Sequence, residues 1–492
     1  MISPATVLAS IEADAAPESA ALLVSIATRY LASTRRGDGP VSTSRSPAEL
    51  DARFAGPVPR GESPLVEVAD MLERLVVADA NRLYHPMYMG HQVSAPLPSA
   101  VWAETVTAVL NNSGTVREMS PSAGAVERQV VRWMCDLAGF EGALAGGTFT
   151  SGGTEATFTA LLAARSRVLP DVWNDGVGDS PPVIVCGEHT HYAVTRAASA
   201  MGLGMRSVVL VPSSERFSMD SAALESALDR LRAEGRTVMA VVATSGSTAT
   251  GTFDDLDAIG RLCESRDLWL HVDGAHGASA LLSDRHRKRL RGIERAWSLA
   301  WDPHKMMLMP LVAGMVLVRD ERWLTAAFSQ HAPYLFHDDA GDDENATPDV
   351  GTRTFLCSRR MDAIKVWVAL QRHGADGIGA IYDGLCEVAA AMHAEIERRA
   401  DLVAIHSPEC NILCFRWIGG FDAANPALDR VNQDARDRYN RSGKGWLTST
   451  MLNGQRVLRV TVMNPRTTVE HALRLLDGVS AEAQAVASEM RL

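Results

Sequence analysis

The sequence has no uninterrupted apolar run that approaches the about 20 residues needed to cross a membrane. Its first residues include acidic side chains and no basic run ahead of an apolar stretch, so they do not resemble a signal peptide. These features predict a cytoplasmic protein with no membrane partner.

Cysteine is sparse and positive charge is in deficit. The seven cysteines are scattered, and the close pair Cys410 and Cys414 has no second pair or nearby histidine at zinc-like spacing. This pattern predicts reduced, buried cysteines and no metal site. Acidic residues outnumber basic ones by 59 to 48, for a formal net charge of −11. An acidic surface argues against nucleic acid as the main partner.

The composition is that of a globular chain with two or three domains: 492 residues, 46% hydrophobic and 22% charged. Between about 147 and 320, short apolar runs alternate with amphipathic segments. Strands are expected at 181–188, 206–212, 237–246, 268–275, 296–303 and 314–320. This alternation predicts an α/β fold with a mostly parallel central sheet covered by helices on both faces. In such sheets ligands bind beyond the carboxyl ends of the strands.

The two ends of the chain have a different texture. Helices are expected at about 18–33, 64–80, 97–112 and 122–138, with an extended connection at 35–63. A long helical pattern from about 376, strands at 411–417 and 455–463 and a last helix near Thr468 indicate a small α+β domain. The predicted division is an N-terminal helical segment at 1–105, a large α/β domain at 106–375 and a small C-terminal α+β domain at 376–492.

A glycine-rich segment, GTFTSGGTEAT, begins at Gly147 and leads into a helical pattern. Glycines let a ligand approach the backbone closely, and the free N–H groups at a helix start attract phosphate. Gly152, Gly153 and Thr154 are therefore a candidate phosphate-binding turn. The alternative is an ordinary helix start in which Thr154 is only the N-cap.

Three further positions could serve a flat aromatic cofactor. Asp273 ends an apolar strand, where a carboxylate could keep a ring nitrogen protonated. Lys305 follows His304 and precedes the apolar run MMLMPL, surroundings that suit an imine-forming amine. His191 could stack on the cofactor ring. The alternatives are a turn aspartate, a lysine on a surface loop and a helix-capping histidine.

The order of these features resembles fold-type I pyridoxal-phosphate enzymes, and in particular the group II amino acid decarboxylases. That group includes glutamate, cysteine sulfinate, diaminobutyrate and aromatic amino acid decarboxylases. SGGTEAT, HVDGAHGA, WDPHKMML and CSRRMDAIKVW (357–367) are similar to the family's phosphate turn, strand end, lysine loop and helix start. The similar motifs run from HPMYMGHQVSAP (85–96) to VLRVTVMNPRTT (457–468). The resemblance implies a pyridoxal 5'-phosphate (PLP) cofactor and the fold-type I PLP-dependent transferase architecture.

The resemblance also implies roles for individual residues. Lys305 would hold PLP as a Schiff base, Asp273 would pair with its pyridine nitrogen and His191 would stack on its ring. Ala275 would pack against the opposite face. The phosphate would be held by Gly153, Thr154, His304 and either Ser247 or Thr248. Tyr334, in HAPYLFHD (331–338), matches a loop tyrosine proposed to protonate Cα. His91, Gln92 and Arg459 would read the substrate, although His91 could be a core histidine and Arg459 could merely pair with an acid.

Several positions depart from the family pattern. Gly274 and His276 stand beside Asp273 where relatives carry alanine and an aromatic residue, and Trp297 stands where many carry aspartate. Asp302 replaces the common asparagine before Pro-His-Lys. An anion so close to the expected phosphate needs an offsetting contact.

The expected reaction is α-decarboxylation of an L-amino acid to a primary amine, with an acidic substrate (aspartate, glutamate or cysteine sulfinate) slightly favoured. Aromatic, aliphatic or diamino substrates remain open, as do transamination and decarboxylation coupled to oxidative deamination. In relatives that carry out that last reaction, phenylalanine replaces the loop tyrosine, so Tyr334 favours plain decarboxylation. A non-catalytic binding relative is a further alternative. The resemblance implies a homodimer with shared active sites and an intertwined N-terminal segment.

Overall fold

The computed structural model describes residues 3–328, 332, 335–336 and 349–491. By internal contacts the chain forms two compact units. The central unit comprises Gln92–Ala390 and His406–Leu413. The terminal unit comprises Met1–His91, Ala391–Ile405 and Cys414–Leu492. The three-part division at 105 and 375 stays a prediction.

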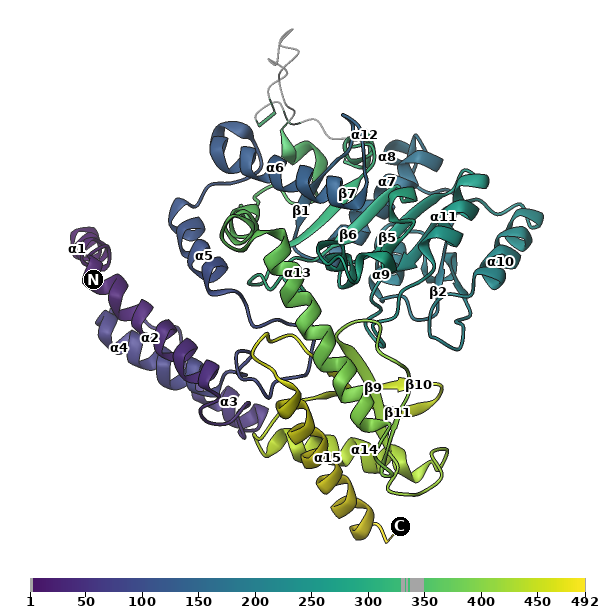
Figure 1. The fold of residues 1–492 in the computed structure, drawn as a ribbon. Coiled ribbons are helices and arrows are strands. Elements are labelled where there is room, and N and C mark those ends of the chain that lie inside the picture. Colours follow the sequence, from purple (N-terminus) through teal and green to yellow (C-terminus); the bar gives the residue numbers. More distant parts are fainter. Residues whose placement is uncertain (1–2, 329–331, 333–334, 337–348, 492) are drawn as a thin grey trace. The chain divides into compact units, whose positions relative to one another are not determined.

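The central unit is built on a seven-stranded sheet with the order β1-β7-β6-β5-β4-β2-β3 (Figure 1). Its strands are β1 (Gly146–Thr150), β2 (Val183–Gly187), β3 (Val208–Val211), β4 (Val238–Thr244), β5 (Trp269–Asp273), β6 (Ser298–Trp301) and β7 (Gly314–Val318). Strands β6, β5, β4, β2 and β3 pair in parallel, whereas β7 pairs antiparallel with both β6 and β1. The predicted α/β fold with a mostly parallel sheet is confirmed. Strand β1 was not foreseen, because its sequence GGTFT has the glycines of a turn.

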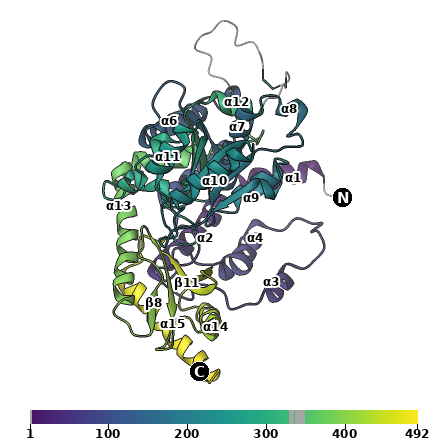
Figure 2. The ribbon, with the colours of Figure 1, turned by 90° about the vertical axis from the view of Figure 1, so that its right-hand side faces the viewer.

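The sheet is covered on both faces: successive residues of a strand point to opposite sides, and every residue of β2 is buried. Ile184 and Cys186 of β2 pack with helices α7 (Gly153–Val168) and α9 (Ala193–Ala200). The alternate residue Val185 is equally buried. Figure 2 gives the view from the side. The remaining helices assigned wholly to this unit are α5 (Pro98–Leu110), α6 (Pro121–Ala138), α8 (Val172–Asp175), α10 (Ser221–Ala233), α11 (Leu256–Ser265) and α12 (Arg322–Ala327).

The terminal unit combines N-terminal helices with a four-stranded sheet in the order β10-β11-β9-β8. Its helices are α1 (Pro4–Asp14), α2 (Pro17–Arg36), α3 (Pro47–Phe54), α4 (Leu65–Met71), α14 (Ala427–Arg441) and α15 (Val469–Glu489). Its strands are β8 (Leu402–Ala404), β9 (Ile412–Trp417), β10 (Thr448–Leu452) and β11 (Gln455–Thr461). The long helix α13 (Ala363–Ile396) is interrupted at Gly374, which has φ 69° and ψ 165°.

Residues far apart in sequence meet within the terminal unit. The N–H of Met89 donates to the Trp446 carbonyl at 2.9 Å, and the Thr461 N–H donates to the Met89 carbonyl at 3.1 Å. The segment 35–63, expected to be extended, contains α3, whose start is fixed by a capping box between Ser46 and Glu49.

Six of the seven cysteines are buried, as predicted, and Cys357 is exposed. Within the part of the chain that the structure describes, no helix combines the length and apolar character that crossing a membrane requires.

Candidate functional site

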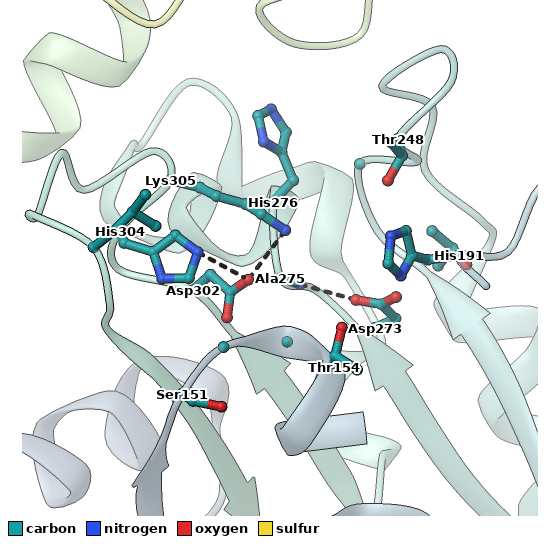
Figure 3. Close-up of a pocket in the computed structure, with 15 residues that line it drawn as sticks. Ser151, Thr154, His191, Thr248, Asp273, Ala275, His276, Asp302, His304 and Lys305 are labelled. Atoms are coloured by element: carbon teal, nitrogen blue, oxygen red, sulfur yellow. Dashed lines mark hydrogen bonds and ion pairs between the residues drawn. The ribbon is translucent and has the colours of Figure 1, made fainter. Parts of the chain in front are cut away.

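A cavity of about 260 Å³ lies in the central unit (Figure 3). It is lined by Ser151, Gly152, Gly153, Thr154, His191, Thr244, Gly246, Thr248, Asp273, Ala275, His276, Asp302, His304, Lys305 and Leu311. Strands β4, β5 and β6 are parallel, so their carboxyl ends share one edge. Strand β1 runs the same way as β6, because each is antiparallel to β7. The cavity therefore forms where several strand ends meet, as the sequence predicted.

The phosphate-turn candidate leaves β1 and opens α7. Gly152 is the N-cap residue, with φ 142° and ψ 176°. The alternative that Thr154 is the N-cap is therefore wrong. A Cβ atom on Gly153 would lie 2.9 Å from the Ala275 Cβ, so only glycine fits between α7 and the end of β5. The first N–H groups of a helix have no intrahelical acceptor, which leaves this turn able to hold an anion.

Asp273 is the last residue of β5 and is 7% exposed. Its Oδ1 accepts a hydrogen bond from the Ala275 N–H at 3.2 Å. The turn contact of the simpler interpretation is therefore present, and the carboxyl group also lines the cavity. Figure 3 shows Asp273 and His191 on one side of the cavity, with Asp302, His304 and Lys305 on the other.

His191 precedes α9, and its Nδ1 accepts a hydrogen bond from the Ala193 N–H at 3.3 Å. Burial lowers the pKa of His191, while the charge of Asp273 opposes this shift. The imidazole is consequently neutral near physiological pH, and a neutral ring suits stacking on an aromatic cofactor.

Lys305 lies in a buried loop, and its side chain is 19% exposed. Met306, Met307, Leu308 and Met309, which follow it, are each at most 1% exposed. The alternative that Lys305 lies on a surface loop is therefore wrong. The Nζ atom lies 3.0 Å from Asp302 Oδ2. His304 Nε2 lies 3.5 Å from the same oxygen, and His304 Nδ1 lies 2.7 Å from the Ala313 carbonyl oxygen. Burial lowers the pKa of His304, and Asp302 opposes that shift.

The turn after β4 brings Thr248 to the cavity. Gly246 has φ 79°, and a Cβ there would lie 2.9 Å from the Gly277 nitrogen. Ser247 points elsewhere, since its Oγ lies 2.7 Å from Thr250 Oγ1 and its side chain is buried. Of the two residues whose hydroxyl groups were predicted to bind phosphate, Thr248 lines the cavity and Ser247 does not.

The predicted substrate residues fall in both units. His91 and Arg459 belong to the terminal unit, and Gln92 to the central one. Arg459 is 8% exposed, and its Nε donates to Thr448 Oγ1 at 3.1 Å. Burial lowers the pKa of His91, and the charges of Arg459 and Arg436 lower it further. The Gln92 Nε2 is buried without a hydrogen-bond partner among the described residues. Tyr334 lies outside the described residues.

Sequence reasoning missed some cavity residues. His276 was noted only as a departure, yet it lines the cavity, and its Nε2 lies 2.7 Å from Asn411 Oδ1. Ser151, Gly246 and Leu311 also line it. Ser151 directly follows β1, and Gly246 lies two residues after β4, so their position near strand ends was the available signal. Leu311 precedes the antiparallel β7, which begins at the same edge.

The donor set fits PLP. A glycine turn with free helix N–H groups and hydroxyls suits the phosphate, and an acid at a strand end suits the ring nitrogen. A primary amine lines the same cavity. The close approach at Gly153 shows that the turn is kept free of side chains.

Comparison with known proteins agrees with this chemistry. Residues 64–418 match the model of the pyridoxal-dependent decarboxylase conserved domain. The L-2,4-diaminobutyrate decarboxylase of Rhizobium meliloti (strain 1021) is 31% identical over 87% of this chain and 84% of its own. The human acidic amino acid decarboxylase GADL1 is 33% identical over 75% of this chain and 69% of its own. The crystal structure of mouse CSAD in apo form aligns with a TM-score of 0.86 at 26% identity, covering 95% of this chain and 99% of that one.

The match spans well over half of the chain, and the glycine turn, the strand end at Asp273 and the Lys305 loop all contribute residues to one cavity. The fold is that of the PLP decarboxylases, and the cofactor is pyridoxal phosphate. The chain belongs to the pyridoxal-dependent decarboxylase family and is an amino acid decarboxylase.

Proposed function

We propose that the chain decarboxylates an acidic L-amino acid, such as aspartate, glutamate or cysteine sulfinate, to the corresponding primary amine. The observation that carries this choice is the positive charge around His91. Arg459 and Arg436 both act on this imidazole, whose own pKa is lowered mainly by burial. A neutral histidine beside guanidinium groups favours a carboxylate or sulfinate and disfavours a second ammonium group.

The relatives leave two substrate classes in contention. The human and rat relatives at 33% identity are named as decarboxylases of acidic amino acids and of cysteine sulfinic acid. The Rhizobium relative is named as a diaminobutyrate decarboxylase. Diaminobutyrate is therefore the second candidate, and the charge around His91 argues against it.

We propose the following roles for the cavity residues. Lys305 provides the amine to which the cofactor is attached, and Asp273 keeps a proton on the pyridine nitrogen. His191 covers the ring on one face, and Ala275 packs on the other. Gly153, Thr154, Thr248 and His304 hold the phosphate, and Ser247 supports that turn through its contact with Thr250. Bound PLP supplies an electron sink for the electron pair left at Cα when carbon dioxide departs.

The substrate residues act before and after that bond breaks. Arg459 would bind a substrate carboxylate, and His91 and Gln92 would contact the side chain. The buried donor at Gln92 Nε2 is available to a substrate oxygen. Tyr334 would return a proton to Cα, which yields an amine; a transamination or oxidative outcome would yield a carbonyl product instead.

We further propose that two copies associate through their N-terminal helices and share active sites. Support comes from apolar side chains left exposed on these helices, including Leu8 (58%), Ile11 (54%), Val66 (61%) and Met71 (47%). Apolar surface of this kind marks association sites. The mass in solution should then be that of two chains, and removal of residues 1–60 should lower it to one or abolish folding.

A substrate panel tests the choice of acid. The PLP-loaded enzyme is incubated with aspartate, glutamate, cysteine sulfinate, 2,4-diaminobutyrate and the aromatic amino acids, and carbon dioxide, amine and aldehyde are measured. An acidic substrate should give the highest kcat/KM, with equal amounts of amine and carbon dioxide. Arg436→Gln should raise KM for that acid, because the charge of Arg436 acts on His91 even though its guanidinium also pairs with Asp437. Arg438→Gln, on the same helix and paired with Glu489, should leave KM unchanged. A preference for diaminobutyrate would refute the proposal.

A further inference from the structure

We propose that the central unit binds an amphipathic anion, a molecule with an alkyl chain and a phosphate or carboxylate head, at a site separate from the Lys305 cavity. Two adjoining cavities make up this site. One is mostly apolar, and the other carries basic side chains at its rim. Leu137 and Arg287 line both cavities, so a single ligand can extend from one into the other. The inference is independent of the substrate and of the residue roles proposed above.

The apolar cavity has a volume of about 490 Å³ and is lined mainly by α6 and α13. Its apolar side chains are Trp133, Met134, Leu137, Leu370 and Ala375, and its polar ones are Asp136, Arg287 and Gln371. Trp133 and Leu137 are four residues apart on α6, so they lie on one face of that helix. Both are only half-buried. Covering such side chains with an apolar group removes further apolar area from water, which is favourable.

The interruption of α13 lies beside this cavity. Gly374 has φ 69° and ψ 165°, and a positive φ favours glycine. A Cβ on Gly374 would meet no atom within 4 Å. Leu370 and Ala375, on either side of the interruption, line the cavity. The helix is therefore broken where its side chains border open space and not a packed neighbour.

The cationic cavity has a volume of about 660 Å³. Its floor is apolar, since Ala138, Leu281, Leu290 and Ile293 are each at most 6% exposed. Its exposed basic side chains are Arg287, Lys288 and Arg291, from one short segment, and Arg319, from the residue after β7. This concentration of cations contrasts with the net charge of −11 for the whole chain.

These cations have weak carboxylate partners or none. Among the residues that the structure describes, Lys288 and Arg319 form no ion pair. The Arg319 guanidinium instead lies 5.4 Å from the centroid of the Trp297 ring. The Arg287 guanidinium lies 3.5 Å from Asp284, whose side chain is 97% exposed, so solvent screens that pair. The basic side chains at the rim are therefore available to an anion.

Acidic side chains at the site are fewer. They are Glu141 and Glu294 in the cationic cavity and Asp136 in the apolar one. Glu294 Oε2 accepts a hydrogen bond from the Gly292 N–H at 3.1 Å, which holds it to its own loop. Arg291 lies 3.6 Å from Asp257, a carboxylate that Arg295 approaches more closely, at 3.1 Å. Four basic residues against three acidic ones leave the combined site positive in an acidic chain.

The two cavities favour two features of one ligand. Guanidinium and ammonium groups bind phosphate and carboxylate oxygens through charge-assisted hydrogen bonds. The apolar cavity stabilises an alkyl chain in proportion to the area that is removed from water. A small inorganic anion would use only the cationic cavity, and a neutral or cationic amphiphile only the apolar one. The arrangement therefore fits an amphipathic anion.

Calorimetric titration of the PLP-loaded enzyme with hexyl, octyl and decyl phosphate, each below its micellar concentration, tests the inference. The affinity should rise by about twofold to fourfold for each added CH2 group, because the chain enters the apolar cavity. Octyl phosphate should bind at least about tenfold more tightly than inorganic phosphate or octylammonium, which each lack one of the two features. Affinities that do not depend on chain length, or inorganic phosphate that binds as tightly as octyl phosphate, would overturn the inference.

Substitutions distinguish the contributions of the two cavities. Arg287→Gln should weaken octyl phosphate binding by about threefold to tenfold, since it removes a guanidinium that borders both cavities. Leu370→Gln should instead reduce the gain for each added CH2 group. Arg372→Gln, at an exposed position of α13 that lines neither cavity, should match wild type. Equal effects of Arg287→Gln and Arg372→Gln would refute the site.

Trp133 reports where the ligand binds. Octyl phosphate should change the tryptophan emission of the wild-type enzyme, and Trp133→Phe should lose most of this change while still binding the ligand. An unchanged emission response in Trp133→Phe would place the ligand elsewhere and contradict the inference.

Two other occupants of these cavities predict different results. If a membrane surface covers them, the enzyme should bind anionic phospholipid vesicles but not monomeric octyl phosphate. If a second copy of the chain covers them, Leu370→Gln should lower the mass in solution, and octyl phosphate should not bind. Either result overturns the inference.

Discussion

Two lysines of the central unit each follow an aspartate by three residues, in the segments Asp302–Lys305 and Asp362–Lys365. Lys365 is 1% exposed and donates to the Val312 carbonyl at 2.5 Å and to Asp362 Oδ1 at 3.0 Å, and it also pairs with Glu104. Lys305 is 19% exposed, pairs with Asp302 and lines a cavity. The same spacing thus produces a lysine fixed by three acceptors and a lysine available for chemistry.

The difference shows what a reactive lysine requires. An amine held by three acceptors has no free position for a ligand, and releasing it would leave the buried Asp362 and the partly buried Glu104 with Arg360 as their remaining ion-pair partner among the described residues. Burial already raises the pKa of Asp362, while Lys365 opposes that shift. Lys305 has a ligand-sized space in front of it. The surroundings of Lys305 therefore give its amine both an ion-pair partner and access to a ligand.

The largest expected effect is on activity, from Lys305→Ala. Loss of the amine should lower kcat/KM for decarboxylation by about 10³-fold or more, because no other side chain can take its place. Carbon dioxide release is measured at saturating PLP, and circular dichroism checks the fold. Lys288→Ala, an exposed lysine, is the control. Activity within tenfold of wild type would break the contrast between the two lysines.

Lys365→Met should instead act on stability. Removing the amine that pairs with the buried Asp362 and the partly buried Glu104 should lower the free energy of unfolding by about 1–3 kcal/mol, because Arg360 still pairs with both acids. Urea unfolding at saturating PLP measures the change. Adding Asp362→Asn should recover part of the loss, since the buried carboxyl group then carries no charge while Glu104 keeps its pair with Arg360. A loss below about 1 kcal/mol would mean that the cluster is not the structural counterpart of the Lys305 site.

Two histidines near Asp273 sharpen the same contrast at smaller magnitude. His191 lines the cavity, whereas His271 is fully buried within β5, with Nδ1 2.9 Å from Ser298 Oγ. Burial lowers the pKa of His271 to about 4. The unfolded chain therefore binds a proton that the folded chain excludes, and stability falls as pH drops below the ordinary histidine pKa and levels off near pH 4.

For wild type, His271 should remove about 2 kcal/mol of stability between about pH 7.5 and pH 5. His271→Gln should flatten the pH dependence of the urea-unfolding free energy by that amount. His373→Gln, at an exposed position, should leave the slope unchanged. An equal slope in both variants would show that the buried histidine takes up its proton without unfolding.

Much of the fold could be predicted because strands of the central sheet are short, continuous apolar runs. β2, β3, β4, β5, β6 and β7 all fall inside the expected ranges. β1 could not be found in this way. Its glycines are required by contacts elsewhere in the fold: a Cβ on Gly147 would lie 2.2 Å from the Val316 carbonyl oxygen of β7. A local pattern does not report such a long-range contact.

The candidate site was predictable to the extent that its residues lie at the ends of strands or within a few residues after them. Asp273, His304 and Lys305 could be named for that reason. That Thr248 lines the cavity, while the Ser247 hydroxyl contacts Thr250, could be seen only in the structure. The charge of Asp302 was expected to need a compensating contact. The structure shows that Lys305, three residues further along the same loop, provides it.

The sequence by itself determined the positions of six strands of the central sheet and the residues at their ends, and with them the cofactor chemistry, because these signals are local and periodic. Tertiary structure decided which of two identically spaced aspartate–lysine pairs borders a cavity and which is sealed. It also joined His276 to Asn411 and Arg359 to Glu127, whose guanidinium and carboxylate lie 2.6 Å apart. The physical reason is that access and charge compensation depend on neighbours distant along the chain, which spacing along one segment does not encode.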